Sequence, residues 1–190
     1  GNASGISELM GYEGLAAKYY FDGLSVCVDE DFKFKGRSKR PPLDEFNSML
    51  SLGYSILMNE IYGAIELKGL NPYFGFMHRD AEKHPTLASD LMEEWRAVLV
   101  DATVMSMING HEVGKEEFYS DVDMPGIYLS KQALKKYINK LEHKFQTDNK
   151  YLSYVNYYVS FRTGIAMQIN SLVKAIEVND AKLYEPIRIR

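Results

Sequence analysis

Four residues of this sequence have the types and spacing that a divalent-metal site requires, and the first is Glu60. On a helix, its neighbours three, four and seven positions away would all be glycine or apolar residues: Gly53, Ile56, Leu57, Gly63, Ala64 and Leu67. A carboxylate among such neighbours is costly to bury unless it is paired, protonated or bound to a cation. Two interpretations therefore stay open for Glu60: a metal ligand, or an acid that pairs with an arginine from elsewhere in the fold.

Asp90 and Glu93 form the second feature, because they lie three positions apart in a segment with helical periodicity. On one helix, their carboxylates would point to the same side and repel each other. A divalent cation would compensate this repulsion, since a metal site needs like charges close together. The alternative is a solvated helix face on which Glu93 pairs with Arg96, one turn further along.

His78 follows the predicted helix of Glu60 and precedes the predicted helix of Asp90 and Glu93. A modest loop would bring all four side chains together, although a lone histidine more often has a structural role. Three carboxylates and one imidazole favour Mg²⁺ or Mn²⁺ over zinc, which prefers sulfur and nitrogen ligands. The sequence thus predicts a magnesium or manganese site made by Glu60, His78, Asp90 and Glu93.

Hydrophobic periodicity predicts a mainly helical protein that would position these residues. Helices are expected at about residues 7–20, 44–68, 86–108, 130–145 and 150–178. Ser130 is available as an N-cap, and Asn109-Gly110 should end the third helix. Strand signals are too few for a sheet of any size, and residues 183–190 should be extended. We expect one domain over residues 4–190, while residues 1–3 could be a cloning scar.

Composition and charge argue against several classes of protein. The formal net charge of −4 over 190 residues does not suit a protein that coats nucleic acid nonspecifically, because such proteins usually carry a basic domain or stripe. Any nucleic-acid contact should therefore be local, and the one concentrated basic stretch runs from Lys33 to Arg40. No apolar run approaches the roughly 20 residues that cross a membrane. The single cysteine, Cys27, cannot form an internal disulfide, and no secretory signal is visible.

Several short motifs follow one another in an order that resembles a known family. They are Gly11-Tyr12-Glu13-Gly14, Ala16-Ala17, Tyr20-Phe21, Arg37-Ser38-Lys39-Arg40-Pro41-Pro42, Asn47, Leu50-Ser51, Gly53-Tyr54, Gly69-Leu70-Asn71-Pro72-Tyr73, Gly75-Phe76-Met77-His78, LASDLMEEWR at 87–96, and Tyr184-Glu185-Pro186 with Arg188 or Arg190. Each motif is weak by itself, but together they cover nearly the whole chain. The chain therefore resembles the Cas1 family, the metal-dependent DNA integrases and nucleases of CRISPR adaptation.

The resemblance implies the same four metal ligands. In the family they are a helix glutamate, the histidine of a glycine-aromatic-histidine loop, and an acid pair on the following helix. Position by position these match Glu60, His78 and Asp90, with Glu93 at the second acid of the pair. Many relatives carry aspartate at that last place, so the longer Glu93 side chain is expected to bind metal through water or only to assist.

The resemblance also implies a site and partners for DNA chemistry. Arg37, Lys39 and Arg40 directly precede the predicted helix of Glu60, and we expect them to hold phosphate near the scissile bond. The alternative is a solvated basic loop. The expected partners are double-stranded DNA, both spacer precursor and CRISPR repeat, and the Cas2 protein.

An all-α, multi-helix catalytic domain is the fold that the resemblance implies. Family members usually begin with a small β-rich domain that contributes to their homodimer, whereas this chain starts almost at the Gly-Tyr-Glu-Gly motif. We therefore expect the fold without that β-rich domain, and a homodimer only for the full-length protein. The expected location is the cytoplasm of a prokaryotic cell.

The implied reaction is insertion of short pieces of invading DNA into a CRISPR array. The 3′-hydroxyl of the incoming DNA would attack a phosphodiester at the repeat boundary, and water in its place would give nuclease activity. Two alternatives stay open. One is a related transposon integrase, for which an added helix-turn-helix module is expected and none is evident in the sequence; the other is a non-catalytic helical interaction domain whose acids form internal salt bridges. A parent protein fused to a reverse transcriptase also stays open.

Overall fold

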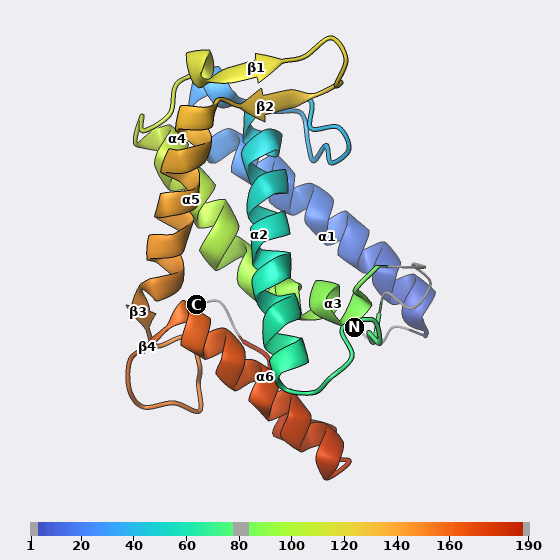
Figure 1. Ribbon diagram of the computed structural model, residues 1–190. Coiled ribbons are helices and arrows are strands. Elements are labelled where there is room, and N and C mark those ends of the chain that lie inside the picture. Colours follow the sequence, from blue (N-terminus) through green and yellow to red (C-terminus); the bar gives the residue numbers. More distant parts are fainter. Residues whose placement is uncertain (1–3, 78–83, 188–190) are drawn as a thin grey trace. The chain divides into compact units, whose positions relative to one another are not determined.

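Six α-helices dominate the part of the chain that the computed structural model describes, residues 4–77 and 84–187 (Figure 1). They are α1 (Ile6–Cys27), α2 (Glu45–Leu67), α3 (Thr86–Trp95), α4 (Ala102–Asn109), α5 (Lys131–Gln146) and α6 (Phe161–Glu177). Short 3-10 turns are η1 (Glu30–Phe32), η3 (Lys115–Glu117) and η4 (Ala181–Leu183). None of the helices described is both long and apolar enough to cross a membrane.

The strands of the described residues form two small hairpins. β1 (Phe118–Ser120) pairs with β2 (Ile127–Leu129) in antiparallel register, so that Tyr119 lies opposite Tyr128. β3 (Asp148–Asn149) pairs in the same way with β4 (Val159–Ser160). The protein is therefore mainly helical, as the periodicity predicts, but it is not purely α.

The last helix begins later than the sequence predicts. The sequence predicts a helix from residue 150, but residues 150–158 connect β3 to β4, residues 159–160 are β4, and α6 starts at Phe161. Ser160 is the N-cap, since its hydroxyl accepts a hydrogen bond from Thr163 N at 3.1 Å. The tyrosine-rich, β-branched composition of this connection fits strand ends better than a helix.

The predicted third helix has an interruption. α3 and α4 are joined by η2 (Arg96–Asp101), a π-helical turn that widens the backbone for six residues. The predicted end of this helix at Asn109 is confirmed.

The first helix is longer than predicted, because α1 continues to Cys27 and does not end near residue 20.

Contacts divide the chain into two units, residues 1–53 with 104–138 and residues 54–103 with 139–190. Three helices, α2, α4 and α5, contribute residues to both units. The division does not test the expectation of a single domain over residues 4–190, which stays a prediction.

The first unit has an aromatic core at the start of α2. Phe34 stacks on Phe46 with ring centroids 4.3 Å apart, and Phe32 meets Phe118 of β1 edge-on at 6.1 Å. Phe46 is fully buried, which contributes about 1.5–3 kcal/mol of hydrophobic stabilisation. This core holds the loop from residue 33 to 42 against the start of α2.

The second unit packs α3 closely against α6. Trp95 is 2% exposed and meets Phe161 edge-on at 6.3 Å. A Cβ on Gly164 would lie 3.2 Å from the Trp95 ring, so the glycine lets the two helices approach each other. This packing positions α3, the helix that carries Asp90 and Glu93.

Candidate active site

Glu60 forms an ion pair with an arginine of α6. Arg162 Nε donates a hydrogen bond to Glu60 Oε2 and Arg162 Nη2 donates one to Glu60 Oε1, each 2.9 Å long. The other side of the guanidinium donates to both carboxylate oxygens of Glu142 in α5, each at 2.8 Å. Two-pronged pairs of this kind are the stronger form of arginine–carboxylate contact. The pair favours the structural interpretation of Glu60 that the sequence left open.

The electrostatics of this pair follow from two carboxylates that share one guanidinium. Hydrogen bonds from Arg162, and then from Gln146, lower the pKa of Glu142 to about 2. The hydrogen bonds to Glu142 and Glu60 raise the pKa of Arg162 above its ordinary value. The Arg162 side chain is 40% exposed and that of Glu60 31%, and exposed pairs contribute only about 0.2–1 kcal/mol. Each Glu60 oxygen accepts one of these hydrogen bonds and keeps a further lone pair, so a cation would either share the carboxylate with Arg162 or displace it at a modest cost.

Asp90 holds the loop that leads to His78. Its Oδ2 atom accepts hydrogen bonds from Phe76 N at 2.5 Å and from Met77 N at 3.0 Å. Thr86, at the start of α3, accepts one from Gly75 N at 2.9 Å. A Cβ at position 75 would lie 2.7 Å from Asp90 Oδ2, so only glycine fits there. His78 itself lies outside the described residues.

Glu93 pairs with Arg96, which is the structural alternative that its spacing predicted. Arg96 Nη1 lies 2.5 Å from Glu93 Oε1, and its guanidinium lies 4.4 Å from the centroid of the Tyr54 ring. The Tyr54 hydroxyl donates a hydrogen bond of 2.5 Å to Asp101 Oδ1 in the π-helical turn. Burial and the neighbouring Asp101 carboxylate raise the pKa of Tyr54. Arg96 thus connects Glu93 of α3 to Tyr54 of α2.

The second unit contains carboxylate oxygens of the kind that Mg²⁺ and Mn²⁺ bind, but its described carboxylates do not lie together in one cluster. Within residues 4–77 and 84–187, no three histidine, cysteine, aspartate or glutamate side chains gather closely enough to hold a metal ion. Glu60 and Glu93 each pair with an arginine instead. Their chemistry fits a hard cation, and in this structure both carboxylates are engaged by arginines. The four-ligand set therefore stays a prediction.

The basic loop divides into an anchored residue and two exposed ones. Arg37 donates hydrogen bonds to Asn47 Oδ1 at 2.9 Å, to Ser51 Oγ at 3.0 Å, and to the carbonyl of Ser38. Asn47 is fully buried, so Arg37 ties the loop to α2. Lys39 and Arg40 are exposed and have no hydrogen bond or ion pair to any described residue. Of the three predicted DNA contacts, these two are available to a phosphate.

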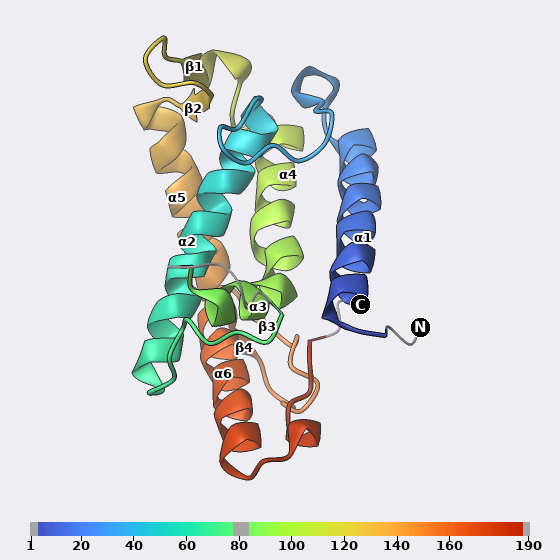
Figure 2. The same ribbon diagram turned by 90° about the vertical axis from the view of Figure 1, so that its right-hand side faces the viewer.

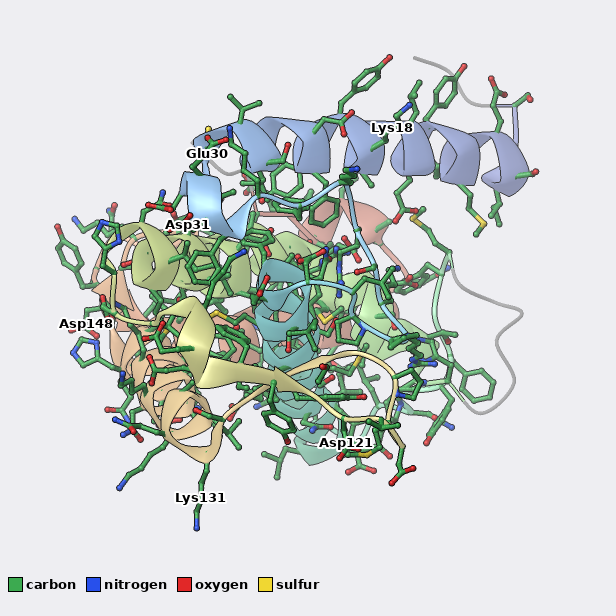
Figure 3. The ribbon with its side chains drawn as sticks, turned by 90° about the horizontal axis from the view of Figure 1, so that it is seen from above. Lys18, Glu30, Asp31, Asp121, Lys131 and Asp148 are labelled. Carbon is green, nitrogen blue, oxygen red and sulfur yellow. The ribbon has the colours of Figure 1, made fainter. Side chains whose placement is uncertain are left out.

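Two further lysines are equally accessible and lie outside the basic loop. Lys131 and Lys135, in the first turns of α5, are exposed and have no partner among residues 4–77 and 84–187. Figure 3 shows Lys131 pointing away from the helix. They carry the same charge as Lys39 and Arg40, so they are a matched control for the loop.

Glu94 is an acid that the sequence analysis did not single out. It accepts hydrogen bonds from Tyr184 Oη at 2.8 Å and from Gln168 Nε2 at 3.1 Å. Gln168 also donates to Glu185 O at 2.9 Å and accepts from Tyr154 Oη at 3.0 Å. Burial raises the pKa of Glu94. The Tyr-Glu-Pro motif was the available signal, and its role in the structure is to attach the tail to α3 and α6.

Glu13 of α1 is a second acid that the sequence analysis passed over. It is half-buried, whereas Tyr12 and Leu15 beside it are 57% and 50% exposed. It makes no hydrogen bond or ion pair within the part of the chain that the structure describes. Its neighbours three and four positions away are Leu9, Met10, Ala16 and Ala17. This is the same apolar pattern that drew attention to Glu60.

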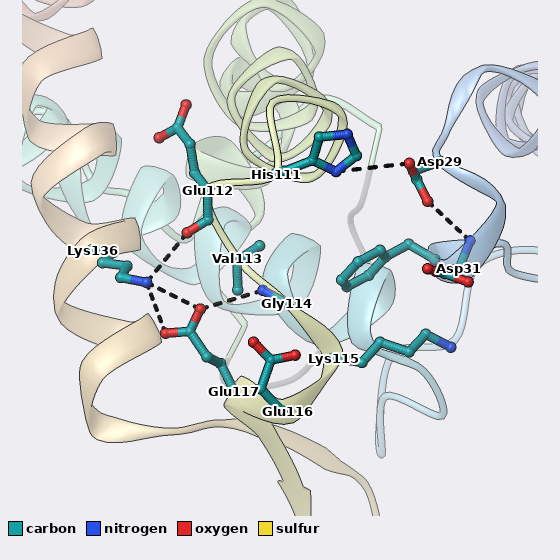
Figure 4. A pocket seen from close by; sticks show the side chains of 11 residues that line it. Asp29, Asp31, His111, Glu112, Val113, Gly114, Lys115, Glu116, Glu117 and Lys136 are labelled. Atoms are coloured by element: carbon teal, nitrogen blue, oxygen red, sulfur yellow. Dashed lines mark hydrogen bonds and ion pairs between the residues drawn. The ribbon is translucent and has the colours of Figure 1, made fainter.

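A charged pocket of the first unit is unrelated to these predictions (Figure 4). Lys136 Nζ lies 2.9 and 3.1 Å from the two carboxylate oxygens of Glu117 and 3.3 Å from Glu112 O. His111 Nδ1 lies 3.9 Å from Asp29 Oδ2. These charges pair across the pocket, and among the described residues no three histidine, cysteine, aspartate or glutamate side chains lie close enough together there to hold a metal ion.

The sequence matches known proteins along most of its length. The family of CRISPR-associated protein Cas1 matches residues 1–143. The CRISPR-associated endonuclease Cas1 of Mycobacterium tuberculosis is 42% identical over 172 residues, which are 90% of this chain and 51% of that protein. A Cas1 endonuclease of Thermus thermophilus is 36% identical over 182 residues, 96% of this chain and 54% of that protein. The chain thus spans about half the length of these relatives.

Solved structures share the fold. A casposase bound to integration product superposes with a TM-score of 0.86 at 25% identity, over 99% of this chain and 53% of that one. A Cas1 protein from Thermotoga maritima has a TM-score of 0.82 at 27% identity, over 94% and 56%. A Cas6-RT-Cas1–Cas2 complex has a TM-score of 0.87 at 29% identity, over 99% of this chain and 20% of that one.

Proposed function

This chain belongs to the Cas1 family, and from that membership we propose that it forms the helical catalytic part of a DNA endonuclease and integrase of CRISPR adaptation. The observation that carries the proposal is the likeness, over 99% of the chain, to a casposase bound to its integration product. The curated relatives, which are named endonucleases, support the nuclease activity. Double-stranded DNA and Cas2 are the partners that we propose, the latter because a Cas1–Cas2 complex shares the fold.

The reaction that we propose is an in-line phosphoryl transfer. The 3′-hydroxyl of the incoming DNA attacks phosphorus at the repeat boundary; a new P–O bond forms, and the broken strand leaves with its own 3′-hydroxyl. Attack by water gives hydrolysis instead. Lys39 and Arg40, exposed on the basic loop, would hold the DNA backbone during either reaction. Arg37 acts indirectly, because its hydrogen bonds to Asn47 and Ser51 hold the loop in place.

A divalent cation, Mg²⁺ or Mn²⁺, is part of this proposal. When bound, it would stabilise the negative charge that develops on the phosphate. We propose His78 and Asp90 as its principal ligands, and the support for them is that Asp90 holds the loop segment directly before His78. Glu93 and Glu60, each of which pairs with an arginine, would complete the site. The cation would thus share these two carboxylates with arginines or displace the arginines from them.

Calorimetry of manganese binding tests this site. The parent chain is compared with His78→Ala, Asp90→Asn, Glu60→Gln and Glu142→Gln, each verified as folded by circular dichroism. Glu142→Gln is the matched control for Glu60→Gln, because both remove a carboxylate partner of Arg162 and only Glu60 is a predicted ligand. We expect one site in the parent, its loss in His78→Ala and Asp90→Asn, and normal binding in Glu142→Gln.

The outcomes separate the interpretations. If Glu60→Gln loses the site while Glu142→Gln keeps it, Glu60 is a ligand; equal behaviour makes Glu60 an ion-pair residue only. Binding that persists unchanged in His78→Ala and Asp90→Asn refutes the proposed site.

The second candidate is a non-catalytic helical interaction domain, which the ion pairs of Glu60 and Glu93 favour. In that case the acids stabilise the fold and bind no cation. A folded chain that binds no manganese, and that neither cleaves nor joins DNA in a strand-transfer assay with a CRISPR-repeat duplex, would support it. Cleavage or joining that requires Asp90 would exclude it.

A further inference from the structure

Two phenylalanines are exposed in the connection between α2 and α3, beside the proposed cation site. Phe74 is 76% exposed and Phe76 51%. Of the other phenylalanines among the nine in the sequence, Phe118 is half-buried, and those that are buried are Phe21, Phe32, Phe34, Phe46, Phe145 and Phe161. Residues 71–77 of this connection, which also carry the exposed Tyr73, form an aromatic loop after the end of α2 (Figure 1 and Figure 2). A single exposed apolar residue is ordinary, whereas several in one place indicate an interaction site.

Hydrogen bonds hold the backbone of the aromatic loop in place. Phe74 N donates to Asn71 O at 3.3 Å, and Thr86 Oγ1 donates to Tyr73 O at 2.7 Å. Asp90 accepts from the amides of the last two described residues of the loop. None of these bonds involves a phenylalanine ring, so the fold of the loop does not require the rings to be there. A ligand that binds them also has little backbone to order, which lowers the cost of binding.

The two phenylalanine rings are the ones in the loop that have no aromatic partner. Tyr73 meets Tyr62 of α2 edge-on, with ring centroids 6.2 Å apart. Phe74 and Phe76 contact no other ring within residues 4–77 and 84–187. Their faces are therefore available, as far as the described residues are concerned, to a flat ligand.

The place of these rings indicates which ligand that is. Asp90 binds the amide of Phe76 itself, at 2.5 Å, and Asp90 is a proposed ligand of the cation. The reacting phosphate would lie close to Asp90, so the rings of Phe74 and Phe76 stand where the neighbouring nucleotide of the DNA would be. A protein partner could also cover apolar rings, but at this position the proposed reaction requires DNA.

A phenyl ring has one way to bind a nucleotide. It carries no charge and no hydrogen-bond donor, so it cannot hold phosphate as Lys39 and Arg40 would. Its flat face can stack on a nucleobase, and such stacking tolerates any base. Bases inside a duplex already stack on both neighbours, so a face is free only on a base that is unpaired or displaced. We propose that Phe74 and Phe76 stack on an unpaired nucleobase next to the reacting phosphodiester. This inference rests on the proposed function.

Fluorescence anisotropy with a labelled duplex that carries a short unpaired 3′ tail tests the proposal. The parent chain is compared with Phe74→Leu/Phe76→Leu, which keeps apolar side chains but removes the flat rings, and with Phe74→Trp/Phe76→Trp, which keeps flat rings. Tyr19→Leu is the matched control, because Tyr19 is an aromatic residue of α1 that is 66% exposed. Thermal unfolding verifies that each variant is folded. The titrations contain EDTA, so that the result does not depend on cation binding.

The leucine double variant should bind the tailed duplex about 5- to 150-fold more weakly than the parent, which is the range for the loss of one stacked base. The tryptophan double variant and Tyr19→Leu should bind like the parent. A second series of DNAs has an abasic nucleotide at each position of the tail in turn. At the position that stacks, the parent should lose affinity by the same factor and the leucine double variant should lose no more, because the missing base is the one that the rings contact.

Three results would overturn the proposal. One is equal binding of the tailed duplex by the parent and the leucine double variant. Another is a leucine effect that persists at every abasic position, because the rings would then contact no base of the tail. The third is a leucine double variant that binds DNA normally but no longer binds Cas2, which would assign the aromatic loop to a protein contact. A parent chain that binds no DNA would refute the proposed function together with this inference, whereas DNA binding that ignores the leucine changes refutes this inference alone.

Discussion

Replacing Gly75 by alanine should release the loop before His78 from α3. A Cβ at position 75 would lie 2.7 Å from Asp90 Oδ2 and 2.8 Å from the carbonyl carbon and Cβ of Thr86. Thr86 is 2% exposed and begins α3, so it has no room to move aside. The loop backbone must therefore shift instead.

The cost follows from the hydrogen bonds that such a shift breaks. They run from Gly75 N to Thr86 Oγ1 and from Phe76 N and Met77 N to Asp90 Oδ2. A neutral hydrogen bond contributes about 0.5–1.5 kcal/mol, and one to a charged group about 1.5–3 kcal/mol. Each released residue regains about 1–2 kcal/mol of backbone entropy, which offsets most of this. We expect a net loss of about 1–2 kcal/mol, or roughly 2–8 °C in Tm.

Thermal unfolding and hydrogen exchange check this expectation, with Gly63→Ala as the control. Gly63 lies within α2, and a Cβ there would meet nothing within 4 Å, so this change should raise helix stability by up to about 1 kcal/mol. Gly75→Ala should lower Tm, speed exchange at Phe76 and Met77, and weaken manganese binding. A Gly75→Ala protein that melts like the parent and retains slow exchange at these two amides would refute the reasoning.

Two further predictions concern charge. Changing Lys39 and Arg40 to glutamine should weaken DNA binding and reduce the slope of log K against log salt by about 2. The same change at Lys131 and Lys135 should alter neither the affinity nor the slope. If a salt titration shows equal effects for the two pairs, the basic loop is not the DNA contact. Because its arginine partner lowers the pKa of Glu142 to about 2, this carboxylate contributes stability above its unfolded pKa near 4.5, and the contribution is lost as the pH falls towards 2. Glu142→Gln should thus destabilise by less than about 1 kcal/mol at pH 7 and not at pH 2 in denaturant titrations, and a pH-independent difference would contradict this.

Local sequence patterns predicted the helices whose ends are set by residues nearby in the sequence. The expected helix at 130–145 is α5 (Lys131–Gln146), and Ser130 caps it by accepting a hydrogen bond from Ala133 N at 3.2 Å. The start of α6 was not predictable in this way. It depends on the pairing of residues 148–149 with 159–160. Such strand pairing joins two separate segments, and the hydrophobic periodicity of one segment carries no information about it.

For the interactions between side chains, too, the local sequence predicts one part and the tertiary structure decides the other. The sequence by itself determined the order of the family motifs and the need of Glu60 for a compensating charge, because both follow from residue type and local spacing. Only the tertiary structure decided that Arg162, 102 positions away, supplies that charge, and that Tyr184 and Gln168 bind Glu94. The physical reason is that burial creates a demand for a partner locally, whereas the partner is chosen by the packing of helices that are distant in the chain.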